Sequence, residues 1–255
     1  MRITILGCGT SSGVPRIGGE WGDCDADDPR NQRTRASILV ESATTTILVD
    51  TGPDMRAQLL AAEVERIDAV IWTHEHADHT HGIDDLRQVF HLRGAAVPGY
   101  GRRETLDLLR KRFAYVFAGR HGYPATVAAH DLADDVMIGD IRVRTVDQPH
   151  GAITSAGLRF DHDGVSAGYA TDFHSFTPEM ASLFAGLDLW IADALRRAPH
   201  PTHAHLAVTL DAIAQVRPRR TILTHMDQSM DYRALANELP DDVEPGFDGL
   251  TVTLA

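Results

Sequence analysis

The stretch Thr73-His74-Glu75-His76-Ala77-Asp78-His79 holds four potential metal ligands within six residues. It follows the apolar run 69–72, which is typical of a buried strand, so the histidines begin where that strand is expected to end. A lone histidine is usually a satisfied core or surface residue, but four such ligands buried without a cation would leave costly unpaired groups. Two imidazoles can face one ion while the carboxylate and the last imidazole turn to another. The sequence therefore predicts a site for two adjacent metal ions.

Composition narrows the class of protein. The chain has 255 residues, of which 43% are hydrophobic, and no linker, compositional break or repeat divides it, so one domain over residues 1–255 is expected. No run of eighteen apolar residues and no signal-peptide pattern occurs, which predicts a cytoplasmic protein without a membrane partner. Cys8 and Cys24 are too few for a disulfide framework.

Charge bears on the partner. A net charge of −12 makes a long nucleic acid unlikely as the main partner, because such binding depends on many Lys and Arg contacts to phosphate. A small phosphorylated substrate remains compatible, since two divalent cations and a few arginines reverse the field locally.

The remaining pattern alternates strands and helices. Strands are predicted at 2–6, 36–41, 45–50, 68–73, 96–99, 127–130, 141–147, 153–160, 165–171, 187–193, 220–224 and 249–254. Helices are predicted at 54–62, 84–92, 102–114, 178–185, from the 200–205 histidines to about 216, and at 231–239. Candidate ligands recur just after strands, at 74–79, 150, 172 and 225, where a rigid sheet can fix an active site.

Two stretches leave alternatives open. The glycine-rich segment 7–15 is expected to be either an anion-binding loop or a plain strand-to-loop turn. The aromatic, glycine-rich segment 115–125 is expected to form a lid, a contact in a homodimer, or a packed surface loop.

The ordered set of candidate ligands resembles the metallo-β-lactamase superfamily of metal-dependent hydrolases. The resemblance rests on Asp50 in Val-Asp-Thr-Gly, the 74–79 cluster, His150, Asp172 and His225. It implies an α/β (α+β) fold, a four-layer αββα sandwich in which helices flank two mixed β-sheets. Within that superfamily the chain is similar to phosphodiesterases acting on phosphoribosyl 1,2-cyclic phosphate, through the motifs at 6–15, 222–226 and 244–250.

The resemblance assigns the metal ligands. It implies that the first ion is held by His74, His76 and His150, the second by Asp78, His79 and His225, and that Asp172 bridges both. Imidazole nitrogen with hard carboxylate oxygen suits zinc, manganese or iron(II), so two divalent ions of zinc or manganese, with iron as a further option, are the expected cofactors. Asp50 is expected either to orient a ligating imidazole or to be only a turn residue. In true β-lactamases of this fold, the ligand that corresponds to Asp172 in the order along the chain is commonly a cysteine.

The expected function is a dinuclear metal-dependent phosphodiesterase. A small cyclic phosphodiester, phosphoribosyl 1,2-cyclic phosphate or a compound like a cyclic nucleotide, would be opened by a metal-bridging hydroxide. His203 is the expected proton donor, with His205 and His200 as rivals, and Asp78 is assigned a catalytic role beside its role as ligand. The bland alternative is that the 200–205 histidines only cap the following helix. Thioester hydrolysis and tRNA 3′-end processing are the alternative activities.

Other residues carry smaller expectations. Arg35, Arg87 and Ser12 are candidates to contact substrate phosphate or ribose, although surface ion pairs are an equal alternative for the arginines. The phosphodiesterases that this chain resembles often carry a cysteine-rich structural zinc site after a Trp-Gly pair. Here only Cys24 follows Trp21-Gly22, and Gln228 stands where a histidine is expected, so no structural zinc is predicted.

Overall fold

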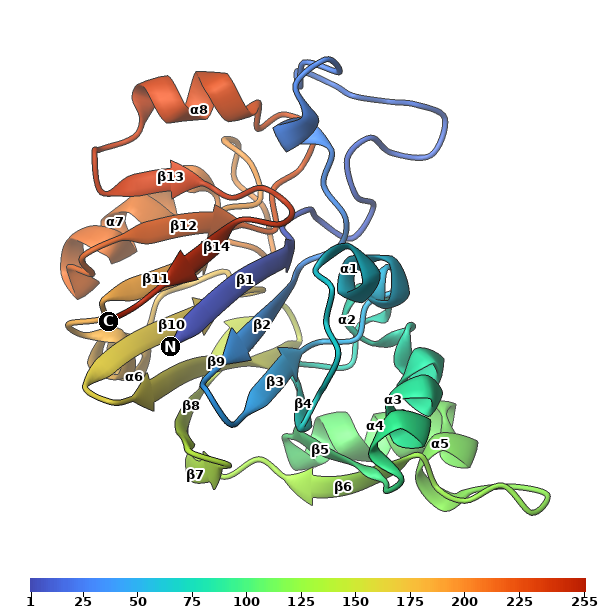
Figure 1. The fold of residues 1–255 in the computed structure, drawn as a ribbon. Helices are drawn as coiled ribbons and strands as arrows, with labels where there is room; N and C mark the ends of the chain where they lie inside the picture. Colours follow the sequence, from blue (N-terminus) through green and yellow to red (C-terminus); the bar gives the residue numbers. More distant parts are fainter.

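A computed structural model describes residues 1–255 as two seven-stranded sheets packed face to face, with helices on their outer faces (Figure 1). The first sheet has the order β14 (Thr251–Thr253), β1 (Arg2–Gly7), β2 (Ser37–Glu41), β3 (Thr46–Val49), β4 (Ala69–Trp72), β5 (Val97–Gly101), β6 (Val127–Asp131). The second has the order β13 (Val243–Pro245), β12 (Thr221–Thr224), β11 (Leu189–Asp193), β10 (Val165–Ala170), β9 (Ile153–His162), β8 (Ile141–His150), β7 (Asp135–Ile138). The expected αββα sandwich of two mixed sheets is confirmed.

The helices form the outer layers. α1 (Met55–Ala61), α3 (Leu86–Arg93), α4 (Arg103–Arg112) and α5 (Ala114–Ala118) pack apolar side chains against the first sheet. α6 (Pro178–Phe184), α7 (Leu206–Val216) and α8 (Tyr232–Glu238) belong to the larger core around the second sheet. α2 (Ala77–Thr80) and two 3₁₀ turns, η1 (Pro29–Asn31) and η2 (Ile83–Asp85), complete the elements. None of the helices is long and apolar enough to cross a membrane.

The strand that precedes the histidine cluster is apolar throughout because both of its faces are covered. Ala69 and Ile71 of β4 point into the core between the sheets, while Val70 and Trp72 point into the core beneath the helices. Successive side chains of a strand face opposite sides, so a strand buried on both faces needs an uninterrupted apolar run. β4 therefore holds the start of the cluster rigidly.

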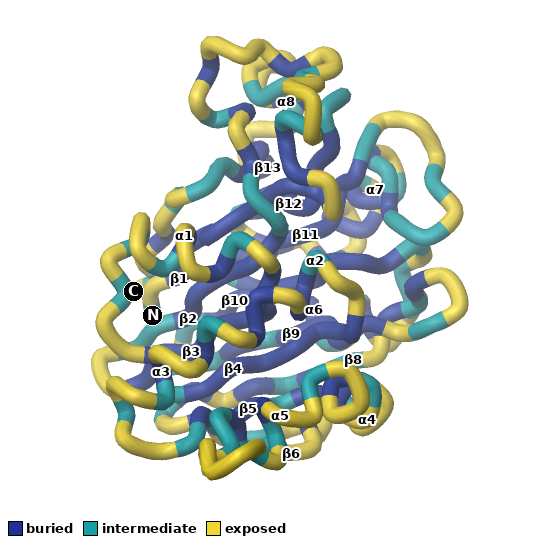
Figure 2. The backbone as a smooth tube through the Cα atoms, turned by 90° about the vertical axis from the view of Figure 1, so that its right-hand side faces the viewer, coloured by how far each residue is buried: buried dark blue, intermediate teal, exposed yellow.

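The direction of the strands gathers the candidate ligands. β3 to β6 run parallel, and so do β10 to β13. The carboxyl ends of parallel strands share one edge of a sheet, so the residues after β4, β10, β11 and β12 arrive on one side of the molecule. Figure 2 looks onto that side, and α2 lies near its centre.

Most predicted elements are present, with instructive exceptions. β7 and β13 are short strands that the pattern missed, and α5 turns the first part of segment 115–125 into helix. β8 continues to His150, because its pairing with β9 runs to the His150–Ile153 pair before the chain turns at Gly151. The helix expected to open at the 200–205 histidines begins only at Leu206, since Ala204 is bound to the backbone of Phe173 and Leu195. Whether the chain is one domain stays a prediction.

A buried arginine holds the long loop between β1 and β2. The Arg33 guanidinium is 1% exposed and donates to the carbonyls of Asp227 and Met230, at 3.3 and 2.6 Å, and to Asn31 Oδ1 at 3.2 Å. It also contacts Cys24 Sγ at 3.8 Å. The loop is thereby tied to the segment that follows His225. No group of three potential metal ligands includes Cys24, and the absence of a structural zinc stays a prediction.

Replacing Arg33 should cost stability. Arg33→Met would leave the buried Met230 carbonyl without a donor and would remove one of two donors from Asp227 O and from Asn31 Oδ1, for which we expect a loss of about 1–3 kcal/mol in the free energy of unfolding. Urea unfolding followed by circular dichroism measures it. Arg103→Met, at an exposed position on α4 with no ion pair, is the matched control and should stay within about 0.5 kcal/mol of the unmodified chain. Equal stability of both variants would contradict this role.

Asp248 joins the C-terminal motif to the first strand. Its carboxylate accepts from Thr34 N and Oγ1 at 2.7 and 2.6 Å and from Cys8 N at 3.1 Å. Burial raises the pKa of Asp248 to about 6, although these hydrogen bonds act in the opposite direction. The motif at 244–250 therefore has a structural role in closing the loop beside β1.

The raised pKa predicts a pH dependence of stability. Below about pH 4 the carboxyl is protonated in both the folded and the unfolded chain, and between pH 4 and 6 the unfolded chain ionises first, so stability is lost as pH rises. Because the side chain is only partly buried, we expect its share to be about 1–2 kcal/mol. The stability difference between the unmodified chain and Asp248→Asn should shrink by that amount from pH 4 to 7. A pH-independent difference would contradict it.

Candidate dinuclear metal centre

Three of the site residues stand at strand ends with unusual backbone geometry. Asp50 after β3, Asp172 after β10 and His225 after β12 have φ values of 66°, 58° and 58°. Left-handed φ values are uncommon for residues other than glycine and cluster at functional sites, where the surrounding structure enforces them. The turn at each strand end aims the side chain into the space between the two sheets.

The cluster that opened the sequence spans a strand end and a short helix. His74 is the second residue after β4, His76 precedes the first turn of α2, and Asp78 and His79 lie within α2. The Thr80 hydroxyl donates to His76 O at 2.8 Å, and Arg112 of α4 donates to Glu75 O. The tight turn of α2 therefore brings ligands from both halves of the motif to one place.

The structure brings all seven predicted ligands together around the Asp172 carboxylate. Oδ1 lies 3.8 Å from His74 Nε2 and 3.6 Å from His150 Nε2. Oδ2 lies 3.2 Å from His79 Nε2 and 3.6 Å from His225 Nε2. Ligand atoms within 4.8 Å of one another form these groups: His74, His76, His150 and Asp172; Asp78, His79 and His225; and Asp172, His203 and His225. Each oxygen of Asp172 thus faces a different set of imidazoles.

Hydrogen bonds from the outside fix which nitrogen of each imidazole faces the centre. His79 Nδ1 donates to Asp50 Oδ2 at 2.7 Å. His74 Nδ1 donates to Thr73 Oγ1 at 3.0 Å, and that hydroxyl donates to the same Asp50 oxygen at 2.8 Å. His150 Nδ1 donates to Thr202 O at 2.8 Å. Nε2 of each of these three rings therefore faces the centre, as in metal sites whose ligands are oriented by outer partners, and Nε2 of His150 lies 3.3 Å from Nδ1 of His76, another ligand of the same group.

The inward nitrogens fit a metal ion. Nε2 of His74, His79 and His225 is buried and has no hydrogen-bond partner. Buried polar atoms without partners are costly, and several converging on one carboxylate are best explained by a cation that accepts their lone pairs. Imidazole nitrogen and carboxylate oxygen are suitable donors for zinc, manganese or iron. The donor set is consistent with a dinuclear site.

Electrostatics point the same way. Burial opposes protonation of His79, but Asp172, Asp78 and Asp50 outweigh it and raise its pKa well above the usual value. Burial is likewise outweighed at His225, where Asp172 and Asp78 raise the pKa to about 9. For Asp78, burial is outweighed by His79 and His225, which lower its pKa. The carboxylates thus favour positive charge at the place where the second ion is expected.

His74 behaves differently. Burial, followed by the charges of the neighbouring histidines, lowers its pKa well below the usual value in spite of Asp172. A neutral imidazole is the form that binds a metal ion, so the surroundings of His74 keep it ready to act as a ligand.

A residue that the sequence analysis left unassigned lies at the end of β11. Asp193 is fully buried, and its Oδ2 accepts from Asp172 N at 3.0 Å and from His203 Nδ1 at 3.1 Å. The signal was available in the sequence as a carboxylate ending a buried strand whose neighbours also end in ligands. Asp193 therefore positions both Asp172 and His203.

The three histidines of the 200–205 segment are separated by the structure. His203 stacks on His225 with ring centroids 4.8 Å apart and lies 4.8 Å from His150. His200 contacts Thr202, and its ring packs edge-on against the ring of His203. His205 is the residue before α7, but its side chain makes no capping bond. The capping alternative is thus wrong for His205, and only His203 reaches the cluster of ligands.

The glycine-rich segment lies beside His225. Thr10 N donates to Met226 O at 3.1 Å, and a Cβ at Gly7 or Gly9 would collide with the backbone of residues 33–35. Close backbone packing therefore accounts for these glycines. Ser12 bonds only to Gly13 and Arg16, and Arg35 pairs with Asp54 at 3.2 Å. Arg87 lies in a separate cavity, described below.

Residues 45–226 match a family model described as the β-lactamase superfamily domain. The chain belongs to this superfamily, as the sequence resemblance indicated. Its fold and its cluster of His and Asp ligands are those of a metal-dependent hydrolase of the superfamily.

Two solved structures show the likeness in detail. A structure described as a new diphosphatase from the PhnP family is 33% identical, with a TM-score of 0.90 over 100% of this chain and 98% of that one. Zn²⁺-bound PqqB from Methylobacterium extorquens is 18% identical, with a TM-score of 0.81 over the whole of both chains, and shows the shared fold.

Two curated relatives carry other names. An octanoyltransferase of Porphyromonas gingivalis (strain ATCC BAA-308 / W83) is 33% identical over 98% of this chain and 51% of that protein. A ribonuclease Z of Bradyrhizobium diazoefficiens is 31% identical over 53% of this chain and 46% of that protein. The chain thus spans about half the length of the curated relatives it matches.

Metal content should follow the grouping around Asp172. The unmodified chain is expected to bind two zinc or manganese ions, and His225→Ala about one, because the second ion would keep only Asp78, His79 and the Asp172 carboxylate that it shares with the first ion. Equilibrium dialysis with elemental analysis measures the ratio. His205→Ala, outside the ligand groups, is the control and should keep two ions. A His225→Ala variant that still binds two ions with unchanged affinity would contradict the grouping.

Proposed function

We propose that the protein is a dinuclear metal-dependent phosphodiesterase that cleaves a small cyclic phosphodiester, such as phosphoribosyl 1,2-cyclic phosphate or a related cyclic nucleotide. The observation that carries the proposal is the Asp172 carboxylate, whose two oxygens face two separate sets of imidazoles. The close likeness to a diphosphatase of the PhnP family supports phosphorus chemistry for this arrangement.

The seven ligands would hold the two cations. His74, His76 and His150 would take the first, Asp78, His79 and His225 the second, and Asp172 both. Two bound divalent ions supply a nucleophile from water near neutral pH and offset the charge of the phosphate oxygens. Zinc, which the PqqB structure contains, or manganese suits these donors best, and iron(II) is compatible with them.

The chain itself would supply the proton for the leaving oxygen. Asp193 binds Nδ1 of His203, which also lies 3.7 Å from Asp172 Oδ1, so this nitrogen faces the buried aspartates. Nε2, on the other side of the ring, is the nitrogen left free to act on a substrate, and the side chain is only partly buried. A histidine held in this way can protonate an alkoxide that leaves from the metal centre. Asp78 would take part in the reaction as a ligand of the second ion.

The other activities fit less well. The octanoyltransferase name belongs to a protein about half of which has no counterpart here, so acyl transfer does not carry over. The ribonuclease Z relative matches only about half of this chain, and a net charge of −12 disfavours binding of tRNA. Thioester hydrolysis gains no support from the relatives.

Leaving-group dependence tests the role of His203. His203→Ala should lower kcat for a cyclic phosphodiester with a sugar leaving group by about 10²–10³-fold, because the poor leaving group needs the proton. For bis(p-nitrophenyl) phosphate, whose leaving group needs none, the loss should stay below about tenfold. Asp193→Asn should show the same contrast in weaker form. Steady-state kinetics on both substrates at saturating metal measures the difference.

The control for this experiment is His205→Ala, which should keep both activities. If His203→Ala lost the same factor in kcat on both substrates, His203 would not be the proton donor. Tight tRNA binding in a gel shift at moderate salt, with cleavage of its 3′ end and no turnover of small diesters, would overturn the phosphodiesterase proposal itself.

A further inference from the structure

A cavity of about 560 Å³ lies between α3, α5 and the hairpin that follows α5. It shares no residue with the ligand groups of the metal centre. In Figure 2, α3 and α5 both lie below α2, on the side of the molecule where the metal ligands gather. Its size is in the range of small-molecule sites, which are typically about 300–1,000 Å³.

The charge of this cavity is unlike that of the rest of the chain. Its basic side chains are Arg87, Arg120, His91 and His121, and its only carboxylate is Asp84. Neighbouring arginines such as Arg93 and Arg110 pair with carboxylates, whereas neither Arg87 nor Arg120 forms an ion pair. Arginines without a carboxylate partner, placed at a cavity of an acidic protein, favour an anionic group such as phosphate.

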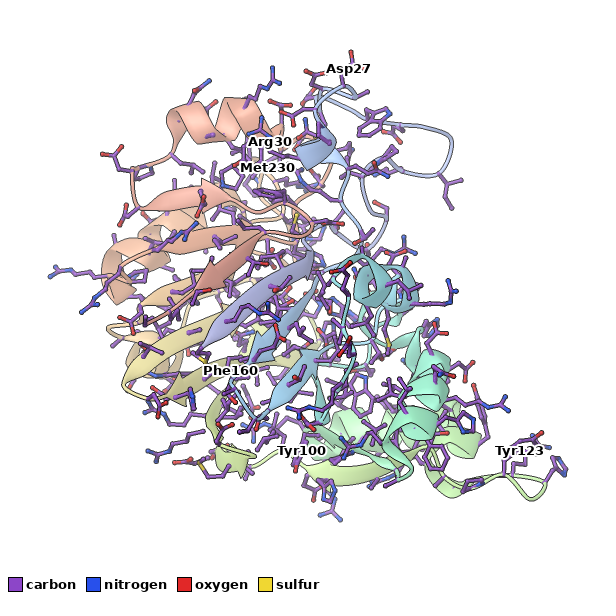
Figure 3. The ribbon with its side chains drawn as sticks, viewed as in Figure 1. Asp27, Arg30, Tyr100, Tyr123, Phe160 and Met230 are labelled. Atoms are coloured by element: carbon purple, nitrogen blue, oxygen red, sulfur yellow. The ribbon has the colours of Figure 1, made fainter.

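Aromatic rings complete the lining. Tyr123, on the hairpin beyond α5 (Figure 3), is 65% exposed, and Tyr115 is 41% exposed, so both offer ring surface to a ligand. The Arg87 guanidinium lies 5.2 Å from the centre of the Tyr123 ring, which holds the hairpin toward α3. The Tyr115 hydroxyl donates to Asp84, so the carboxylate is already engaged. Exposed rings next to free guanidinium groups suit a flat aromatic ring that carries phosphate.

We propose that this cavity is a binding site for a nucleotide, separate from the metal centre. The base stacks on Tyr123 and Tyr115, and the phosphate is bound by Arg87 and Arg120. The proposal goes beyond the phosphodiesterase activity, because none of the residues that line the cavity belongs to the ligand groups of the metal centre.

The link between the two sites runs through the end of α4. Arg112 donates to the Glu75 carbonyl between His74 and His76, and the Phe113 ring contacts His81 at a centroid distance of 5.5 Å. α5 begins at the next residue, Ala114, and carries Tyr115 and Val116 into the cavity. A nucleotide in the cavity would therefore contact α5, and α5 follows directly after the end of α4 that binds the loop holding His74 and His76.

Calorimetric titration of the full chain with AMP tests the proposal. The experiment uses Asp172→Asn as background, so that a disabled metal centre contributes no phosphate binding. AMP should still bind, Arg87→Ala and Arg120→Ala should each weaken it about tenfold, and Tyr123→Ala should weaken it while Tyr123→Phe does not. Arg103→Ala, outside the cavity, is the matched control.

The ligand components separate the contributions. Adenosine and inorganic phosphate alone should each bind at least tenfold more weakly than AMP. Loss of AMP binding in the Asp172→Asn background, or binding that Arg87→Ala and Tyr123→Ala leave unchanged in folded variants, would overturn the proposal. If inorganic phosphate bound as tightly as AMP, the base would contribute nothing to binding, and the assignment of a nucleotide to this cavity would be wrong. Each of these failures leaves turnover of phosphodiesters by the unmodified chain, and so the proposed function, unaffected.

Discussion

The carboxylate of Asp172 and the imidazoles that face it impose the strongest constraint on this structure. Burying five such side chains within a few ångströms costs free energy unless their charges and lone pairs are satisfied. Oδ1 of Asp172 faces three imidazole nitrogens and Oδ2 faces two, at 3.2 to 3.8 Å, and three of these nitrogens have no hydrogen-bond partner. The fold must therefore hold this group rigidly enough for a cation to complete it, and the φ of 58° at Asp172 shows that the backbone is bent to do so.

A second buried carboxylate makes that rigidity possible. Asp50 binds His79 directly, reaches His74 through the Thr73 hydroxyl, and accepts from Thr73 N at 2.8 Å. It comes from β3, whereas Thr73 follows β4, so the bond also locks two neighbouring parallel strands at their ends. Asp193 plays the matching part in the other sheet, where it joins β11 to Asp172 and His203. Each sheet thus contributes one aspartate that orients the ligands of the centre.

The sequence predicted what depends on local pattern and on strand ends. The apolar run before His74 and the repeated placement of ligands after strands indicated a layered fold with a metal site, and the resemblance to the superfamily supplied the αββα arrangement and the seven ligands that the structure gathers. Asp193 was missed although it ends a predicted strand, because its role depends on β11 lying beside β10, which local pattern does not show. The structural role of Arg33 was also missed, because its acceptors, Asp227 and Met230, are almost two hundred residues away in the chain.

The distribution of charge explains how an acidic chain can act on an acidic compound. The carboxylates that raise the pKa of His79 and His225 lie inside the centre, where two divalent cations would more than offset them. Outside it, many arginines are paired with carboxylates, so the surface offers little to a polyanion. Arg87 and Arg120 form no ion pair, and both line one cavity on the side of the metal centre. Attraction of anions is thereby confined to compact sites, which favours small phosphorylated ligands over long nucleic acids.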